Sequence, residues 1–302
     1  MRILASDGME KNAVAKLREQ GHEVVEQFYE PAELAEQVKN FDVLVVRSAT
    51  KVRTPIIDAA LETGKLKLII RGGVGIDNID HEYAESKGIK VMNTPRASSN
   101  AVAELAMAHM LSCARFVSIA GHTMREGLWE KKAYKGIEVH GKTLGIVGYG
   151  RIGQSLGNMA IAMGMEVVAY DVYHVPGIEN EHMHYVELDE LFAVSDFISL
   201  HVPSLEGKPM VNAETIAKMK DGVIIINTSR GTNIDEAALL DALNSGKVRA
   251  AGLDVWSSEP CKNTELLNHP HVSCTPHIGA STNEAQKRIG AEIVDIIGKF
   301  FA

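Results

Sequence analysis

Three polar side chains follow three separate apolar runs in the second half of the chain. Arg230 comes after residues 223–227, Glu259 after residues 250–255 and His277 after residues 272–274. A histidine titrates near neutral pH and can take the proton of a hydroxyl group as a hydride leaves its carbon. A carboxylate bonded to the imidazole fixes its tautomer, and an arginine fork binds a carboxylate or polarises a carbonyl. The three types therefore suit hydride transfer at an alcohol carbon. Taken singly, they are read more readily as an Arg–Glu surface pair and a histidine packed in a turn, and it is their shared place on ligand-side loops behind a dinucleotide motif that favours function.

The element that would position a cofactor beside them lies in the middle of the chain. An apolar run at residues 143–147 meets Gly148-Tyr149-Gly150-Arg151-Ile152-Gly153, and a helical pattern follows. Gly148 permits a tight turn off the strand, Gly150 lets the backbone approach a pyrophosphate, and Gly153 lets the helix pack closely on the sheet. The free N–H groups of the helix N-terminus favour phosphate binding. This order of strand, glycines and helix predicts a dinucleotide site.

Asp171 ends the next apolar run, where a carboxylate can accept hydrogen bonds from the ribose hydroxyls of the cofactor. The residues after it, Val172-Tyr173-His174, include no Arg or Lys to accept a 2′-phosphate. We therefore expect NAD rather than NADP.

Short apolar runs alternate with helical patterns along both halves of the chain, which predicts parallel sheets covered on both faces. We expect strands at residues 3–5, 42–46, 67–70, 90–92, 143–147, 167–170, 197–201, 223–227, 250–255 and 272–274. Helices are expected at residues 12–20, 32–39, 55–62, 79–87, 152–163, 188–194, 213–220 and 236–244. Residues 98–119 are expected to form one long apolar helix, which is either a subunit interface or internal core. A last helix at about residues 283–300 returns to the first domain.

The fold class is thus α/β, with two doubly wound parallel-sheet domains. A Rossmann-type cofactor domain at residues 98–279 is inserted into a flavodoxin-like substrate domain at residues 1–97 and 280–302, and the active site is expected between them. Loops at the carboxyl ends of the strands would bring Arg230, Glu259 and His277 together beside the cofactor.

The composition is that of a globular enzyme, with 302 residues, 45% of them hydrophobic and 23% charged. A formal net charge of −8 argues against nucleic acid as a partner. Three unpatterned cysteines fit a reducing compartment, and we expect a cytoplasmic protein with no membrane segment. His182 and His184 have no carboxylate or cysteine pattern around them, so no metal site is expected.

The ordered set GYGRIG, Asp171, NTSRG, GLDVW, EP and TPHIGAST resembles the D-isomer-specific 2-hydroxyacid dehydrogenase family over nearly the whole chain. The resemblance implies His277 as acid/base, Glu259 as its partner and Arg230 as substrate anchor. Besides the three glycines of the motif, it implies cofactor contacts at these residues: Arg151, Ile152, Asp171, His201, Thr228, Asp254 and Gly279. It further implies a homodimer formed largely through the cofactor domains.

A second glycine cluster, Arg71-Gly72-Gly73-Val74-Gly75, also follows an expected strand. It lacks the third glycine of the fingerprint, so we reject it as a second nucleotide site. On physical grounds it is either a nest of backbone N–H groups for a carboxylate or a tight turn. The family resemblance favours binding of a substrate carboxylate at Gly73 and Val74.

Within the family, the strings VVRSAT, RGGVGIDNID, VMNTPRASSNAVAELA, GLWEKK and HIGASTNEAQ are most similar to the phosphoglycerate dehydrogenase group. This implies 3-phospho-D-glycerate as substrate, in serine biosynthesis, with Arg47 as a phosphate ligand. It also implies that Lys131 lies in a segment that can reach a neighbouring subunit's active site. By their chemistry alone, Arg47 can equally face water and Lys131 can belong to a solvated face. The chain ends after the last helix, so we expect a short form without a C-terminal regulatory domain.

Two other functions stay open at this point. Hydroxypyruvate, glyoxylate or D-lactate are rival substrates that need no phosphate pocket. The family also includes an NAD-binding corepressor, so a nucleotide sensor that recruits partners is the alternative of another class. The chain has no basic runs or linear-motif segments, which favours the enzyme.

Overall fold

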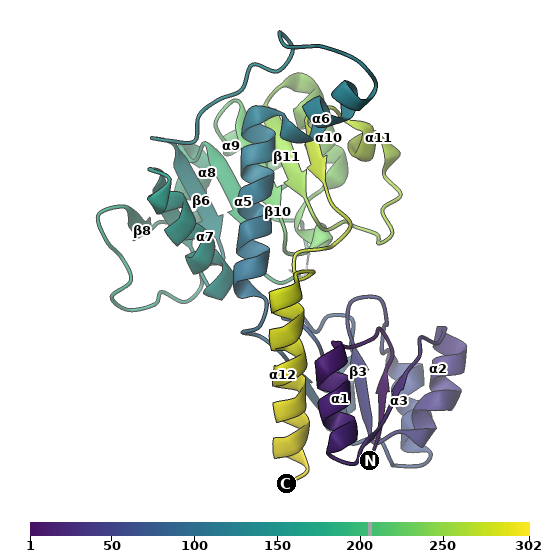
Figure 1. The fold of residues 1–302 in the computed structure, drawn as a ribbon. Helices are drawn as coiled ribbons and strands as arrows, with labels where there is room; N and C mark the ends of the chain where they lie inside the picture. Colours follow the sequence, from purple (N-terminus) through teal and green to yellow (C-terminus); the bar gives the residue numbers. More distant parts are fainter. Residues whose placement is uncertain (205–206) are drawn as a thin grey trace. The chain divides into compact units, whose positions relative to one another are not determined.

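The computed structural model describes residues 1–204 and 207–302 and divides the chain into two compact units (Figure 1). Unit 1 comprises residues 1–98 and 280–302, and unit 2 comprises residues 99–279. Each unit contains one sheet whose strands pair in parallel.

Unit 1 is built on a sheet of five strands in the order β2-β1-β3-β4-β5. These strands are β1 (Arg2–Ala5), β2 (Glu23–Glu26), β3 (Val43–Val46), β4 (Leu68–Arg71) and β5 (Lys90–Asn93). Its helices are α1 (Lys11–Glu19), α2 (Pro31–Gln37), η1 (Val38–Asn40), α3 (Thr54–Leu61), α4 (His81–Ser86) and α12 (Asn283–Phe300).

Side chains of alternate strand residues in unit 1 point to opposite faces of the sheet, as they must in a β-strand. Ile3, Val43 and Val45 pack beneath α1 and α12, whereas Leu4 and Leu44 pack beneath the helices of the other face. The C-terminal helix α12 thus completes the core of the first unit. Two buried faces explain why the strands read as continuous apolar runs rather than alternating ones.

Unit 2 is built on a sheet of seven strands in the order β12-β11-β10-β9-β6-β7-β8. These strands are β6 (Thr143–Val147), β7 (Glu166–Tyr170), β8 (Met183–Tyr185), β9 (Phe197–Leu200), β10 (Val223–Asn227), β11 (Val248–Leu253) and β12 (Val272–Cys274). Its helices are α5 (Ser99–Arg115), α6 (Val117–Arg125), α7 (Arg151–Ala162), α8 (Leu188–Val194), α9 (Ala213–Lys218), η2 (Gly231–Asn233), α10 (Glu236–Ser245) and α11 (Thr264–Asn268).

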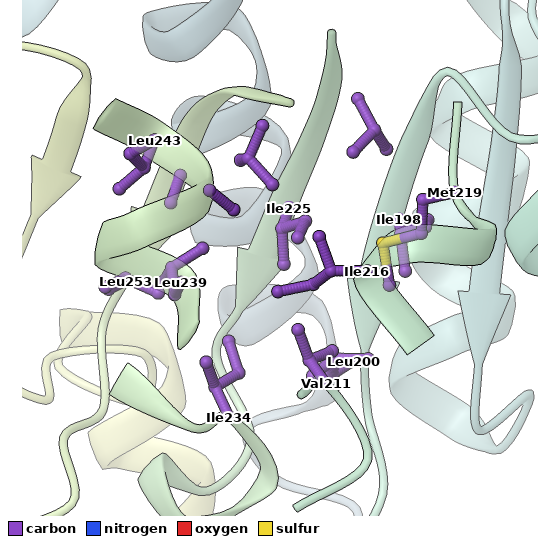
Figure 2. Close-up of a cluster of buried hydrophobic side chains, with 14 of the residues drawn as sticks. Ile198, Leu200, Val211, Ile216, Met219, Ile225, Ile234, Leu239, Leu243 and Leu253 are labelled. Carbon is purple, nitrogen blue, oxygen red and sulfur yellow. The ribbon is translucent and has the colours of Figure 1, made fainter. Parts of the chain in front are cut away.

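The two faces of the second sheet are also both covered. On one face, Ile198 and Ile225 pack with Ile216 of α9 and Leu239 of α10 in the cluster shown in Figure 2. On the other face, Phe197 and neighbouring strand residues pack under α5 and α7. The chain order reverses between β6 and β9, which is the switch point where such sheets bind nucleotides. Both sheets therefore have the doubly wound architecture expected from the sequence.

The expectation of one long helix over residues 98–119 is wrong. Helix α5 ends at Arg115, and α6 follows at a bend of 67°. The break is at Phe116, whose φ of 57° is left-handed. Its ring makes an edge contact with His271 at 5.6 Å between centroids, and the guanidinium of Arg249 lies over it at 5.5 Å. The ring of Phe116 thus contacts two segments distant in the sequence at the point where the helix is interrupted.

Helix α5 lies inside unit 2, with its apolar residues buried under the sheet, so it belongs to internal core. Across the part of the chain that the structure describes, no single helix is long and apolar enough to cross a membrane; α5 and α6 pass that test only when counted together as a bent pair.

Candidate active site

The glycine loop after β6 has the close contacts that its sequence predicts. Gly148 has a φ of 92°, and a Cβ there would lie 2.6 Å from the carbonyl oxygen of His201. A Cβ at Gly153 would collide with the carbonyl oxygen of Gly148, so only glycine lets α7 approach the strand this closely. Gly150 faces open space, with nothing within 4 Å of a Cβ position. The loop thus leaves room for a ligand at the N-terminus of α7, beside Arg151 and Ile152.

Asp171 lies directly beside this loop, after β7. Its carboxylate accepts hydrogen bonds from the backbone N–H of Tyr149 at 2.7 Å and of Tyr173 at 3.1 Å. The first of these bonds fastens the glycine loop to the end of the neighbouring strand. Val172, the next residue, is 94% exposed. The carboxylate is therefore held at the mouth of the loop, where a ribose would be bound.

Two buried polar atoms near the switch point have no hydrogen-bond partner among the described residues. They are Nδ1 of His201, after β9, and Oγ1 of Thr228, after β10. The other ring nitrogen of His201 lies 2.9 Å from the hydroxyl of Ser199, and burial lowers the pKa of His201 to about 4. A neutral imidazole and a free hydroxyl offer partners to a polar ligand. Together with the open space at Gly150, these atoms fit a bound dinucleotide.

The histidine and the carboxylate expected from sequence form a direct pair. Nδ1 of His277 lies 2.7 Å from Oε2 of Glu259, and both side chains are partly exposed. Burial acts to raise the pKa of Glu259, but the hydrogen bond and charge of His277, together with the charge of Arg230, outweigh it and lower the pKa. Because Nδ1 faces Glu259, Nε2 is the nitrogen left for a substrate.

Arg230 follows β10 and precedes η2. Asn227 holds its backbone by donating to the carbonyl of Arg230 at 2.8 Å, and Nη1 of Arg230 donates to the carbonyl of Ser229 at 2.6 Å. Its charge acts on Glu259, so the structure groups all three of the expected catalytic side chains in unit 2. They come from the carboxyl ends of β10, β11 and β12, which are neighbours in the sheet.

Asp254 and Gly279, both expected as cofactor contacts, bond to each other. Asp254 is 1% exposed, and its carboxylate accepts from the backbone N–H groups of Ile278 and Gly279 at 2.8 and 2.9 Å. It also accepts from the hydroxyl of Thr275 at 2.6 Å. Asp254 thus fastens the loop that carries His277. Sequence reasoning missed Thr275, although the hydroxyl stands two residues before the histidine in TPHIG.

The expected substrate residues of unit 1 lie at adjacent strand ends. Arg47 follows β3, and Gly73 and Val74 follow β4, its neighbour in the sheet. The carboxylate of Asp7 accepts from the backbone N–H of Arg47 at 2.6 Å and fixes that loop. The guanidinium of Arg47 makes no hydrogen bond or ion pair within residues 1–204 and 207–302. A cation is thus available at this edge of the sheet.

The turn after β4 requires glycine at position 73. Its φ is 151°, and a Cβ there would collide with the guanidinium of Arg71. The N–H of Gly73 donates to the carbonyl of Arg71 at 2.9 Å, whereas that of Val74 has no acceptor in the described parts of the chain. Of the two residues expected to bind a carboxylate, Val74 therefore has the free donor.

Lys131 is exposed in unit 2, in the segment after α6. In the sequence it is far from Arg230, Glu259 and His277. Trp129, two residues earlier, is 79% exposed. The structure of the single chain gives neither side chain a binding partner among the residues it describes.

Comparison with known proteins agrees with this geometry. Residues 107–279 match the family model described as D-isomer specific 2-hydroxyacid dehydrogenase, NAD binding domain. A hydroxypyruvate reductase of Thermotoga maritima is 50% identical and covers 99% of this chain and 97% of that protein. A D-3-phosphoglycerate dehydrogenase of Methanocaldococcus jannaschii is 47% identical over 99% of this chain, which spans 57% of that protein's length.

A solved structure is similar along the full chain. It is a D-lactate dehydrogenase from Aquifex aeolicus complexed with NAD and lactic acid, with a TM-score of 0.88, 30% identity and coverage of 100% of this chain and 95% of that one. With the NAD-binding sheet, the glycine loop and these relatives in agreement, the chain belongs to the D-isomer-specific 2-hydroxyacid dehydrogenase family and is an NAD-dependent enzyme of that family.

Proposed function

We propose that His277, Glu259 and Arg230 carry out the interconversion of a D-2-hydroxy acid and its 2-oxo acid. The observation that carries this proposal is the 2.7 Å pair between His277 and Glu259, on loops at the carboxyl edge of the NAD-binding sheet. Bound NAD supplies the hydride acceptor in the oxidative direction.

The role of each of the three side chains follows from the hydrogen bonds that its atoms already make. Nε2 of His277 removes the proton of the substrate hydroxyl, because Nδ1 is bonded to Glu259. The carboxylate of Glu259 stabilises the imidazolium that forms. Arg230 binds the substrate carboxylate or the developing carbonyl with its guanidinium fork. In reduction the same imidazolium returns its proton to the carbonyl oxygen.

We propose that NAD is held by the glycine loop, Asp171, His201 and Thr228. Asp171 would exchange its bond to the backbone of Tyr173 for bonds to the ribose hydroxyls. Its charge would repel the additional phosphate of NADP. The buried, unpartnered atoms of His201 and Thr228 support a polar ligand in this place.

For the substrate we propose 3-phospho-D-glycerate, which would place the chain in serine biosynthesis. The available guanidinium of Arg47 supports a phosphate ligand in unit 1, and the free N–H of Val74 supports a carboxylate nearby on the adjacent strand end. Gly73 would contribute by keeping the turn open. Lys131 is proposed to reach the substrate of a neighbouring copy.

A second substrate is favoured by a different observation. The hydroxypyruvate reductase of Thermotoga maritima is 50% identical and matches this chain over 97% of its own length. If this chain acts on hydroxypyruvate or glyoxylate, no phosphate has to be bound and Arg47 serves no catalytic purpose. D-lactate, the ligand class of the solved Aquifex aeolicus structure, makes the same prediction for Arg47.

The decisive experiment compares 3-phospho-D-glycerate with D-glycerate, because the two differ only by the phosphate. Arg47→Ala is expected to lower kcat/KM for the phosphorylated acid by about 10- to 100-fold and to leave D-glycerate unaffected. Lys51→Ala is the matched control, since Lys51 is an exposed cation four positions along the same loop. Equal loss for both acids, or none for either, would overturn the phosphate assignment. Tight NADH binding without turnover of any 2-hydroxy acid would favour the sensor instead.

A further inference from the structure

A histidine outside the three catalytic residues is buried under the sheet of unit 2. His109 lies on α5 and is 3% exposed. It fits there because residue 252 of β11 is glycine: a Cβ at Gly252 would lie 2.6 Å from Cβ of His109. A polar ring placed in an apolar helix against a strand without a side chain needs partners on both nitrogens.

Those partners lie on the segment that leads to His277. Nδ1 of His109 lies 3.0 Å from the hydroxyl of Ser273, and Nε2 lies 2.9 Å from the hydroxyl of Thr275. The hydroxyl of Thr275 in turn donates to Oδ1 of Asp254 at 2.6 Å. A continuous chain of hydrogen bonds thus runs from Ser273 through His109 and Thr275 to Asp254.

The direction of each bond in this chain follows from donor counting. Thr275 has one hydroxyl hydrogen, and the carboxylate of Asp254 can only accept it. Thr275 must therefore accept from His109, so Nε2 of His109 carries a hydrogen. Burial lowers the pKa of His109 against the opposing charge of Asp254, which keeps the ring neutral near pH 7. Nδ1 is then the acceptor, and Ser273 donates to it.

At the end of this series of hydrogen bonds, Asp254 holds the loop that carries His277, which we call the catalytic loop. Its carboxylate accepts from the N–H groups of Ile278 and Gly279, and its backbone carbonyl accepts from the N–H of His277 at 2.8 Å. His277 has a φ of 54°, a left-handed conformation that is uncommon for a residue with a side chain and that the surrounding contacts help to maintain. These contacts converge on Asp254.

We infer that His109 is a positioning residue for His277, acting through Thr275 and Asp254 as a neutral, Nε2-protonated link that orients the catalytic loop. The inference rests on the proposed role of His277. Both ring nitrogens of His109 are occupied by hydrogen bonds, so this histidine does not compete with His277 for the proton of the substrate hydroxyl.

The kinetic test uses pairs of variants that differ in a single donor. His109→Leu and Thr275→Val each remove a hydrogen-bonding group at similar side-chain volume. His109→Gln keeps a donor toward Thr275, and Thr275→Ser keeps a hydroxyl toward Asp254. The first two are expected to lower kcat by about 10- to 100-fold while KM for the hydroxy acid and the Kd for NADH change less than about threefold. The conservative partners should recover most of kcat, and His184→Leu, an exposed histidine on the edge strand β8, should leave kcat unchanged.

A merely structural histidine would lower the melting temperature without changing kcat per folded site, and that result would overturn the inference. So would equal losses in Thr275→Val and Thr275→Ser. If His109→Leu does not fold, the two Thr275 variants still decide the question. Thr275→Val only replaces the hydroxyl by a methyl group, and Thr275→Ser only removes the methyl group.

A second readout does not depend on turnover. ¹⁵N NMR of the imidazoles in the parent protein near pH 7 should show His109 protonated at Nε2 and unprotonated at Nδ1. The opposite tautomer would sink the inference even in an active enzyme. An inactive parent protein with the expected tautomer would instead contradict the proposed function and leave the link intact.

Discussion

Glu259 and His277 stand 18 residues apart in the chain and meet at 2.7 Å. The contact depends on β11 and β12 being adjacent parallel strands, because both loops then leave the same edge of the sheet. Neither residue belongs to a helix or strand, so the rigid sheet that carries both loops fixes the relative position of the two side chains.

Replacing Glu259 by Gln should lower kcat about 100-fold in either direction, because the amide cannot stabilise the imidazolium that carries the proton. Steady-state rates with NADH and a 2-oxo acid test this directly. Glu265→Gln, an exposed carboxylate on α11, is the control and should have no effect. Unchanged rates in Glu259→Gln would mean that the pair is only structural.

The same pair predicts a pH effect on stability. The pKa of Glu259 is lowered from 4.5, so its contribution to stability is fully present above that pH and is lost as the pH falls through the lowered value. The difference in melting temperature between the parent protein and Glu259→Gln should therefore shrink as the pH falls below 4.5. A difference that grows on acidification would contradict the assignment.

Replacing His277 by Ala should abolish turnover while NADH binding stays within about threefold of the parent, because the glycine loop and Asp171 remain. Rates and fluorescence titration with NADH separate the two effects. The matched control is His182→Ala, since His182 is a partly exposed histidine paired with Glu166. Loss of NADH binding in His277→Ala would show that the histidine supports the cofactor site rather than the chemistry.

Much of this site could be predicted from sequence because the motifs are local. The glycine loop predicts a strand, a turn and a helix in direct succession over residues 143–162, and the strand at residues 143–147 has the bounds that were expected. The apolar runs were long enough to identify most of the buried strands. The strands at two sheet edges, β2 and β8, were missed because they are partly exposed and their sequences, EVVE and MHY, are not continuous apolar runs.

What could not be predicted depends on contacts between distant segments. His109 and Thr275 are 166 residues apart, and the sequence of α5 does not indicate which distant residues bond to His109. The break at Phe116 was missed for the same reason, since the rings and the guanidinium that favour it lie far along the chain. A histidine in an apolar helix opposite a glycine-containing strand was the available signal.

Asp171→Asn tests the cofactor preference more cleanly than Asp171→Ala. The amide oxygen can still accept from the backbone of Tyr149 and hold the glycine loop, but it no longer repels a 2′-phosphate. We expect NAD affinity to fall about 10-fold and the ratio of NAD affinity to NADP affinity to fall by more than 10-fold. Isothermal titration with both dinucleotides gives the ratio. An unchanged ratio would rule out the ribose assignment.

A homodimer is expected, with α6 and the segment after it as the interface. Val117, Met124 and Trp129 are 62%, 58% and 79% exposed there, and α6 buries none of its own residues. Light scattering should give twice the mass of the 32.8 kDa chain. Met124→Glu should shift the protein toward monomer, whereas Phe28→Glu, an exposed aromatic in unit 1, should not. A monomeric parent protein would refute the expectation.

Two glycine-to-alanine changes should have opposite effects on stability. At Gly252 a methyl group would lie 2.6 Å from Cβ of His109 and 2.8 Å from Cδ1 of Ile226, and both neighbours are buried. Gly252→Ala should therefore cost about 1–3 kcal/mol of unfolding free energy and lower kcat with it, since His109 is displaced. Gly298 lies in α12 with nothing within 4 Å of a Cβ, so Gly298→Ala should stabilise by up to about 1 kcal/mol without changing kcat. Denaturant unfolding with parallel rate measurements checks both, and a Gly252→Ala protein that unfolds earlier yet keeps its full kcat would break the connection between His109 and the catalytic loop.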